Sequence, residues 1–220
     1  EGNKVLEIGW GWGGFSEYLA KNYNVSIDCI TISKKQFEFS KNRIAASGLD
    51  NKVNVKFLDY RDVKDKYDNI ASIEMIEAVG ENYLDKYFGT IKNSLKSNGT
   101  AAIQGITISD KLFERYRRSE DFIQKYIFPG GFLPSEKFMK QLIKKHNLSL
   151  DKINTYSDDY AKTLNIWKSN FVNAWKNISP LGFDEAFKRM WEFYLSYCEA
   201  GFKSKNINLI QFSMSNNQSV

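Results

Sequence analysis

Lys4-Val-Leu-Glu-Ile-Gly-Trp-Gly-Trp-Gly-Gly14 is the stretch of sequence that decides the fold. Its first five residues form a short apolar run bounded by glycine, which is typical of a buried β-strand. Its glycines then allow a tight turn and let a ligand approach the backbone. Residues 15–21 have the spacing of an α-helix, whose first turn would offer free N–H groups to that ligand. The stretch therefore predicts a strand, a ligand-binding loop and a helix, in that order.

The acidic residue inside the first strand narrows the choice of ligand. With the glycines it gives the order E-x-G-x-G-x-G, formed by Glu7, Gly9, Gly11 and Gly13. This order resembles the first motif of S-adenosylmethionine-dependent methyltransferases, in which the second glycine approaches the amino-acid part of the cofactor. A dinucleotide is the alternative, but its site would favour an acid at the end of the second strand. That end reads Ile30-Thr-Ile-Ser33, so the sequence favours S-adenosylmethionine over NAD.

Strands and helices alternate over the first half of the chain. Further strands are predicted at residues 25–30, 53–58, 70–76 and 100–106, and helices at 34–47 and 83–95. This alternation predicts an α/β protein with a mostly parallel sheet covered by helices on both faces.

The alternation ends after residue 108. Helices are predicted at 135–146, 159–177 and 184–202, and a last strand at 207–214 on the sheet edge. We expect one domain over 1–220, with a cofactor-binding half at about 1–108, a helical substrate-pocket region at about 109–205 and a final strand at 206–214.

Composition excludes several classes of protein. Hydrophobic residues make up 42% of the 220 residues, which excludes wholesale disorder. No stretch approaches the ~20 consecutive apolar residues of a membrane-spanning helix. The two cysteines lie far apart, so we expect neither a disulfide framework nor a metal site, and a cytoplasmic location. The net charge of +5 suits nucleic acid and an anionic bilayer equally well.

Two further segments carry a specific resemblance: Ser72-Ile-Glu-Met-Ile-Glu-Ala-Val-Gly80 and Tyr126-Ile-Phe-Pro-Gly-Gly-Phe-Leu-Pro-Ser135. Both closely resemble the cyclopropane-fatty-acyl-phospholipid synthase and mycolic acid methyltransferase family. Residues 11–15, 159–167 and 190–202 are also similar to it, in the same order. The resemblance covers nearly all of the chain. It implies a Rossmann-like class I methyltransferase fold, with a mostly parallel seven-stranded sheet and a helical insertion that forms a lipid pocket.

The resemblance also implies an activity. Family members transfer a methyl group from S-adenosylmethionine to the cis double bond of an unsaturated phospholipid acyl chain. A bound bicarbonate then deprotonates the resulting carbocation, which gives a cyclopropane or a branched chain. The aromatic content of 15% suits such a pocket, because aromatic faces stabilise a cation, although an aromatic core is the simpler interpretation. The implied partners are lipid rather than nucleic acid, and a homodimer is possible.

Residue roles follow from the same resemblance. Glu77, Tyr160 and the backbone of Ile106 match positions that hold the bicarbonate, and Cys198 matches a cysteine near the active site that is not the nucleophile. Each has an ordinary alternative. Glu77 could cap the helix that begins near Glu81, Tyr160 could belong to the core, and Cys198 could be a small packed hydrophobe.

The residues expected to bind the cofactor follow the first three strands. They are Glu7, Gly9, Gly11, Gly13, Thr31, Ser33, Gln36, Asp59 and Tyr60. We expect Asp59 to accept a hydrogen bond from the adenine amino group and Tyr60 to pack on the ring. The alternative for Asp59 is an ordinary turn that caps a helix.

The sequence also departs from the family. Gln104 stands where many synthases carry a histidine bicarbonate ligand, and Ala78 stands at another usual histidine position. Glutamine donates a neutral hydrogen bond but does not titrate, so anion binding could be altered and the product branched rather than cyclic. The chain starts at Glu1, directly before a strand. We therefore expect an interior piece of a longer chain that lacks the family's N-terminal segment.

Three classes of function stay open. The first is a lipid acyl-chain methyltransferase at the inner membrane face, where basic residues would meet anionic head groups: Lys111, Arg115, Arg117 and Arg118. A solvated helix face is the simpler interpretation of these charges. The second class is a methyltransferase of a soluble small molecule. The third is a degenerate module that binds cofactor or lipid without turnover.

Overall fold

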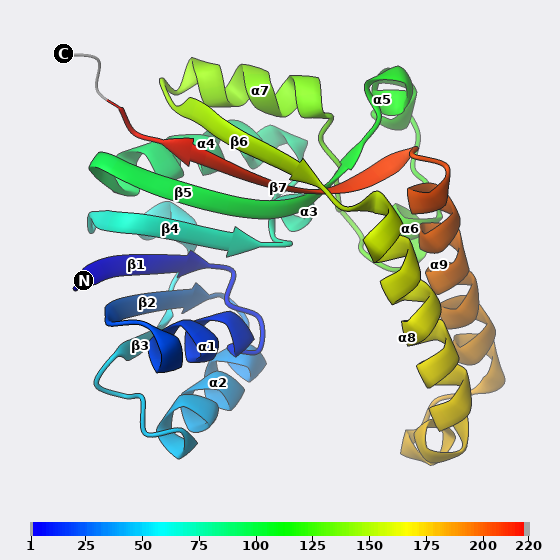
Figure 1. Ribbon diagram of the computed structural model, residues 1–220. Coiled ribbons are helices and arrows are strands. Elements are labelled where there is room, and N and C mark those ends of the chain that lie inside the picture. The colour runs from blue at the N-terminus through cyan, green and yellow to red at the C-terminus, as the bar shows by residue number, and fades with distance from the viewer. Residues whose placement is uncertain (1, 218–220) are drawn as a thin grey trace.

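A seven-stranded sheet forms the centre of the computed structural model, which describes residues 2–217 (Figure 1). The strand order is β3-β2-β1-β4-β5-β7-β6. The strands are β1 (Asn3–Ile8), β2 (Val25–Thr31), β3 (Val53–Phe57), β4 (Tyr67–Ile73), β5 (Leu95–Ile108), β6 (Ser149–Thr155) and β7 (Ile207–Ser215). The first five run parallel, and β7 pairs antiparallel with both β5 and β6. The predicted α/β class and mostly parallel seven-stranded sheet are confirmed.

Helices cover both faces of the sheet, as the apolar strands require. Neighbouring residues of β1 show this, because Val5 packs with Ala20 and Ile44 whereas Leu6 packs with Leu84 and other residues of the opposite layer. Successive side chains of a strand point to opposite faces, so the two clusters are the two layers of the core. One layer contains α1 (Gly14–Asn22) and α2 (Lys34–Ala46), and the other contains α4 (Glu81–Ser94) and α7 (Glu136–Lys145).

The end of β4 differs from the prediction. The strand was expected to reach residue 76, but it ends at Ile73 because Glu74 has a φ of 51°, which turns the chain. Ile76 instead begins the short helix α3 (Ile76–Val79). The turn places two carboxylates, at positions 74 and 77, beyond the carboxyl end of the sheet.

The edge of the sheet also differs from the prediction. The last strand, β7, lies between β5 and β6 rather than at the edge. Strand β6 is the edge and was not predicted, because its sequence Ser-Leu-Asp-Lys-Ile-Asn-Thr is mostly polar and largely solvent-facing. An edge strand needs only one buried face, so its apolar signal is weak.

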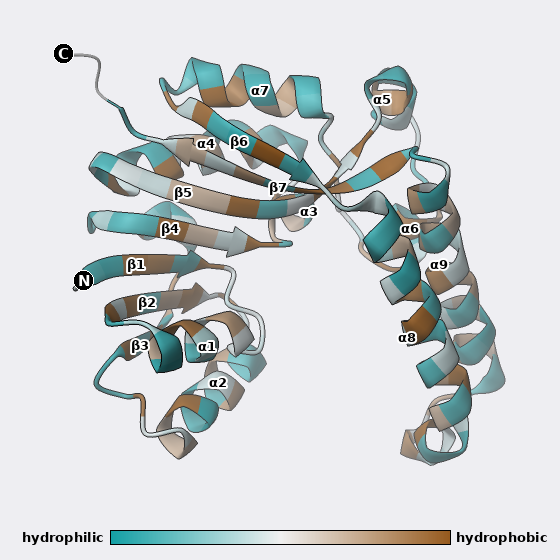
Figure 2. Ribbon diagram, viewed as in Figure 1, coloured by the Kyte–Doolittle hydropathy of each residue, from teal (hydrophilic) through white to brown (hydrophobic). Residues whose placement is uncertain are grey.

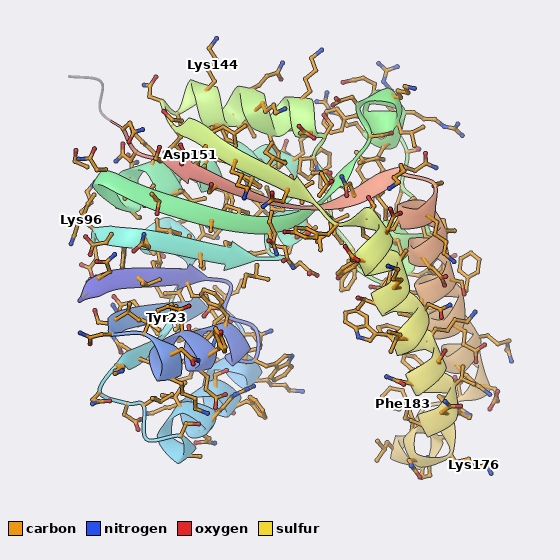
Figure 3. All side chains as sticks on the ribbon, in the orientation of Figure 1. Tyr23, Lys96, Lys144, Asp151, Lys176 and Phe183 are labelled. Atoms are coloured by element: carbon orange, nitrogen blue, oxygen red, sulfur yellow. The ribbon has the colours of Figure 1, made fainter. Side chains whose placement is uncertain are left out.

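The second half of the chain adds a helical layer beyond one end of the sheet (Figure 1). It consists of α5 (Asp110–Tyr116), α6 (Phe122–Tyr126), α8 (Ser157–Ile178) and α9 (Glu185–Lys203). Two 3₁₀ turns are present as well: η1 (Tyr60–Asp62) follows β3, and η2 (Ser179–Leu181) links α8 to α9. Figure 3 places Lys176 and Phe183 at the end of the α8–α9 pair that is far from the sheet.

The hydropathy pattern follows this arrangement. Figure 2 shows brown residues along the central strands, whereas α7, α8 and α9 alternate between brown and teal as amphipathic helices do. Helices α8 and α9 bury a cluster of their own against β7, formed by Ala161, Leu164, Leu195, Phe202 and Leu209. None of the helices within residues 2–217 combines the length and the apolar character needed to cross a bilayer.

Candidate active site

The glycine-rich loop after β1 has the tight geometry that the sequence predicts. Gly9, Gly11 and Gly13 have φ values of 77°, 59° and 82°. A Cβ atom at Gly9 would lie 2.8 Å from the Met75 sulfur, and one at Gly13 would lie 2.7 Å from Nε1 of Trp10. A Cβ atom at Gly11 would meet no atom of residues 2–217 within 4 Å. Gly9 and Gly13 are therefore required by packing, whereas Gly11 exposes backbone to open space, which suits a loop that receives a cofactor.

Glu7 holds this loop on the sheet. Its side chain is only 2% exposed and accepts a hydrogen bond from the hydroxyl of Ser16, in the first turn of α1. The same hydroxyl lies 2.9 Å from the sulfur of Cys29 on β2. Burial raises the pKa of Glu7 to about 7. An acidic residue within the strand therefore has a structural role, because it anchors the first turn of α1 to the sheet. A direct contact between Glu7 and the cofactor stays a prediction.

The predicted residues after β2 are brought together at the start of α2. The Thr31 hydroxyl donates to Oε1 of Gln36 at 2.8 Å and accepts from the Ser33 N–H at 3.1 Å. Ser33 caps α2, because its Oγ accepts from the Gln36 N–H. The Gly9 and Trp10 N–H groups both donate to the carbonyl of Ile30. The first two loops therefore lie side by side, as a nucleotide-type site at the carboxyl ends of parallel strands requires.

Asp59 and Tyr60 lie after β3. Asp59 caps η1, and its carboxylate also binds the Arg61 guanidinium, with Nη2 to Oδ2 at 2.6 Å and Nε to Oδ1 at 2.9 Å. The hydrogen bonds from Arg61 lower the pKa of Asp59. The capping role of Asp59 is confirmed, and its contact with adenine stays a prediction. The Tyr60 ring packs edge-to-face on Tyr87, with 5.7 Å between the ring centroids.

A solvent-accessible cavity of about 1050 Å³ lies beyond the carboxyl ends of β4 and β5, bordered by α5, α6, α8 and α9. This volume lies slightly above the range of roughly 300–1,000 Å³ that ligand pockets occupy. Its wall is rich in aromatic rings, among them Tyr116, Phe128, Phe132, Tyr160, Trp167 and Tyr194. Its polar groups include the two carboxylates that the turn after β4 brings into place. The lining suits a long apolar ligand with one polar reaction point.

Glu77 is the more buried of these carboxylates. Its Oε1 accepts from the N–H of Ile106 on β5, and its Oε2 is buried without a hydrogen-bond partner among the described residues. Burial raises the pKa of Glu77 to about 7. The alternative that Glu77 caps the next helix is wrong, because Gly80 occupies the N-cap of α4 and no side chain caps it.

Glu74 was not predicted as a site residue, but it contacts two residues that were, Gln104 and Tyr160. Its Oε1 accepts from Nε2 of Gln104 at 2.7 Å, and its Oε2 accepts from the Tyr160 hydroxyl at 2.8 Å. Nε2 of Gln211 in turn donates to the amide oxygen of Gln104 at 2.8 Å. Burial and the nearby Glu74 charge raise the pKa of Tyr160, so its hydroxyl remains a donor. The sequence did carry a signal for Glu74: it is an acidic residue at the carboxyl end of a parallel strand, and ligands of such sheets bind at that end.

Cys198 lines the cavity from α9. Burial raises the pKa of its thiol to about 12, so the sulfur is protonated at neutral pH and is a poor nucleophile. Tyr194, one turn earlier on α9, also faces the cavity, and burial raises its pKa to about 12. Tyr194 lay within a segment that resembles the family but was not predicted as a site residue. Ala78 also lines the cavity.

The sheet order, the glycine loop and the cavity beyond β4 and β5 define a Rossmann-like S-adenosylmethionine-dependent methyltransferase fold. The family model of mycolic acid cyclopropane synthetases matches residues 1–212, and the chain belongs to this family. The resemblance predicted from the sequence is thereby confirmed.

Individual relatives agree with this assignment. Tuberculostearic acid methyltransferase UfaA1 of Mycobacterium tuberculosis is 38% identical over 215 residues, covering 97% of this chain and 50% of that protein. Cyclopropane-fatty-acyl-phospholipid synthase of Escherichia coli K12 is 38% identical over 210 residues, covering 96% and 52%. The crystal structure of mycolic acid cyclopropane synthase CmaA1 with SAH and CTAB superposes with a TM-score of 0.89 at 25% identity, covering 97% and 78%. The chain spans about half the length of the curated relatives it matches.

Proposed function

We propose that this chain transfers a methyl group from S-adenosylmethionine to the cis double bond of an unsaturated phospholipid acyl chain. The observation that carries the proposal is the large aromatic cavity whose wall includes two neighbouring carboxylates, Glu74 and Glu77. The family supports it, because relatives at 38% identity are named as a tuberculostearic acid methyltransferase and a cyclopropane-fatty-acyl-phospholipid synthase.

The cavity suits the chemistry of this reaction. An alkene is a weak nucleophile, and S-adenosylmethionine, when bound, supplies a methyl group on a positively charged sulfur that such a nucleophile can attack. Methylation leaves a carbocation on the acyl chain. Aromatic faces stabilise a cation, and rings such as Tyr160 and Trp167, whose centroids lie 6.1 Å apart, line this cavity. A site that excludes water also protects the cation from hydration.

Loss of a proton from the added methyl group completes the reaction. It gives a cyclopropane if a ring closes, or a methylene branch if a hydride has first shifted along the chain. A base in the cavity has to accept this proton. The family resemblance implies a bound bicarbonate in this role, held by Glu77, Tyr160 and the backbone of Ile106, with Gln104 in place of a histidine ligand.

The predicted holders do not fit a bicarbonate in this arrangement. The Ile106 N–H donates to Glu77, and both Tyr160 and Gln104 donate to Glu74. Each of these three donors is thus directed at a carboxylate of the chain itself, and an added anion would have to displace Glu74 from two of them. No step is assigned to bicarbonate for this reason.

The outer rim of the cavity suits a lipid surface, and we include peripheral contact with the anionic inner face of the cytoplasmic membrane in the proposal. Tyr126 and Phe128, which lie on and just after α6, are each 55% exposed. Arg115 lines the cavity, and it is exposed like Lys111 and Arg118. Arg117 is less suited than the sequence suggested, because it pairs with acidic residues of α4 and α5.

The experiment that tests the proposal incubates the chain with methyl-labelled S-adenosylmethionine and vesicles of dioleoyl phospholipids. Mass spectrometry of the released fatty acids should show the gain of one labelled carbon per modified chain. Vesicles of fully saturated phospholipid are the matched control and should gain none. Equal labelling of both lipids, or none of either while the cofactor binds, would contradict the proposal.

A further inference from the structure

Glu74 occupies an unusual place in the backbone. It is a non-glycine residue with a φ of 51°, in the left-handed region that side chains disfavour. Its N–H donates to the carbonyl of Gln104 at 2.9 Å, which fixes the turn against β5. Strained residues of this kind cluster at functional sites, where the surrounding structure holds them. Glu74 lines the cavity, and its side chain stays accessible to solvent there.

The carboxylate of Glu74 is held by neutral groups. Gln104 donates to one oxygen at 2.7 Å and Tyr160 to the other at 2.8 Å. Gln211 fixes the orientation of the Gln104 amide, because it donates to the amide oxygen and leaves the NH₂ group for Glu74. These donors orient an acceptor without supplying a counter-charge of their own.

The donors are the ones that the family resemblance assigns to bicarbonate. In this chain Tyr160 and Gln104 bind Glu74, so a carboxylate of the protein stands where a bound anion was expected. Glu77 is a second carboxylate in the cavity wall, three residues further along the chain. Its raised pKa of about 7 lets it hold a proton beside Glu74, which limits the repulsion between the two acids.

We propose that Glu74 is the catalytic base of this chain and takes the place of bicarbonate. The inference rests on the proposed function and names the residue that completes it. The π electrons of the alkene form the new C–CH₃ bond while the methyl–sulfur bond breaks and leaves its electron pair on sulfur. The Glu74 carboxylate then takes a proton from the added methyl group. The C–H electron pair closes the cyclopropane ring or, after a hydride shift, forms the methylene double bond. The protonated Glu74 returns the proton to solvent.

Direct binding tests the inference without turnover. Glu74→Gly removes the carboxylate and suits the positive φ, so this variant should fold. Carbon-13 NMR with labelled bicarbonate should show no binding to the wild type and saturable binding to Glu74→Gly, because Tyr160 and Gln104 are released. Adding Tyr160→Phe to Glu74→Gly should abolish that binding. Wild-type protein that binds bicarbonate, and loses it with Tyr160→Phe, would overturn the inference.

Turnover gives a second measurement, in buffer freed of carbon dioxide. The wild type should be unaffected by added bicarbonate, and Glu74→Gly should lose about 10²-fold or more in rate, as removal of a general base does. Added bicarbonate should restore part of the Glu74→Gly activity but none of that of Glu74→Gln, which keeps the side chain's shape. The matched control, Glu38→Gln on the exposed face of α2, should behave as the wild type.

The two hypotheses fail in different ways. An inactive wild type on unsaturated lipid would refute the proposed function, and the binding experiment would still decide which anion Tyr160 holds. An active wild type whose rate falls at least tenfold without bicarbonate would refute the role of Glu74 alone. Unchanged activity of Glu74→Gln would do the same.

Discussion

Glu77 makes the stability of the fold depend on pH in a direction that can be worked out. Burial raises the pKa of its carboxyl group from 4.5 to about 7. The folded protein therefore keeps a proton there that the unfolded chain has already lost at neutral pH. The contribution of Glu77 to stability is fully present below the unfolded pKa and is lost as the pH rises through 7. A shift of this size, at 1.36 kcal/mol per pKa unit, corresponds to roughly 3 kcal/mol.

Glu77→Gln removes this dependence, because the amide does not titrate and its oxygen can still accept from the Ile106 N–H. Near pH 5 we expect the variant and the wild type to have similar free energies of unfolding. Near pH 8 the variant should be more stable by roughly 3 kcal/mol, since it avoids a buried charge. Urea unfolding followed by tryptophan fluorescence at both pH values measures the difference.

Glu38→Gln makes the same chemical change at an exposed site and should follow the wild type at both pH values. Glu7 has a pKa raised to about 7 as well, but it is present in every protein compared, so its effect cancels. A constant difference between Glu77→Gln and the wild type from pH 5 to pH 8 would refute the reasoning, because it would mean that Glu77 titrates alike in the folded and unfolded states.

Three further predictions concern the cofactor loop, the cavity and the lipid surface. Gly11→Ala and Gly48→Ala both place a side chain at positive φ in open space, so each should cost about 1–2 kcal/mol of stability. Only Gly11→Ala should weaken S-adenosylmethionine binding, by tenfold or more in calorimetry; equal affinities would contradict the loop assignment. The Cys198 thiol, with its pKa near 12 instead of 9.0, should react with iodoacetamide about 10³-fold more slowly than an exposed thiol at pH 8. Rapid alkylation of the native protein would contradict its burial. Activity on anionic vesicles should fall with added salt, and still further when glutamine replaces Lys111, Arg115 and Arg118 together. No salt dependence would contradict the membrane contact.

The sequence was sufficient for the parts of the fold that depend on local signals. The glycine order after β1 predicted a tight loop, and its three positive φ values confirm it. The longer amphipathic helices were found to within a few residues, whereas the short helices α5 and α6 were not predicted. Ser135 caps α7. Apolar runs located the strands with two buried faces, and the polar edge strand β6 was missed because half of its surface needs no apolar residue.

The site was harder to predict because it depends on how distant segments meet. Glu74 lies inside a segment that resembles the family, yet nothing in the sequence indicates its positive φ or the turn that brings it beside Gln104 and Tyr160. Its partners, Gln104 and Tyr160, are 30 and 86 residues away along the chain. The pairing of Asp59 with Arg61 is local and was predictable from the turn alone. Residue types therefore indicated the class of chemistry, but only the tertiary fold shows which group each donor serves.

The most direct test of the central claim follows the hydrogens of the transferred methyl group. The chain is incubated with S-adenosylmethionine that carries a fully deuterated methyl group and with vesicles of dioleoyl phospholipid, and the released fatty acids are weighed by mass spectrometry. Each modified acyl chain should gain one carbon with two deuterium atoms, because a base in the cavity removes the third. Chains that retain all three deuterium atoms, or the appearance of label only in a soluble acceptor, would contradict the account.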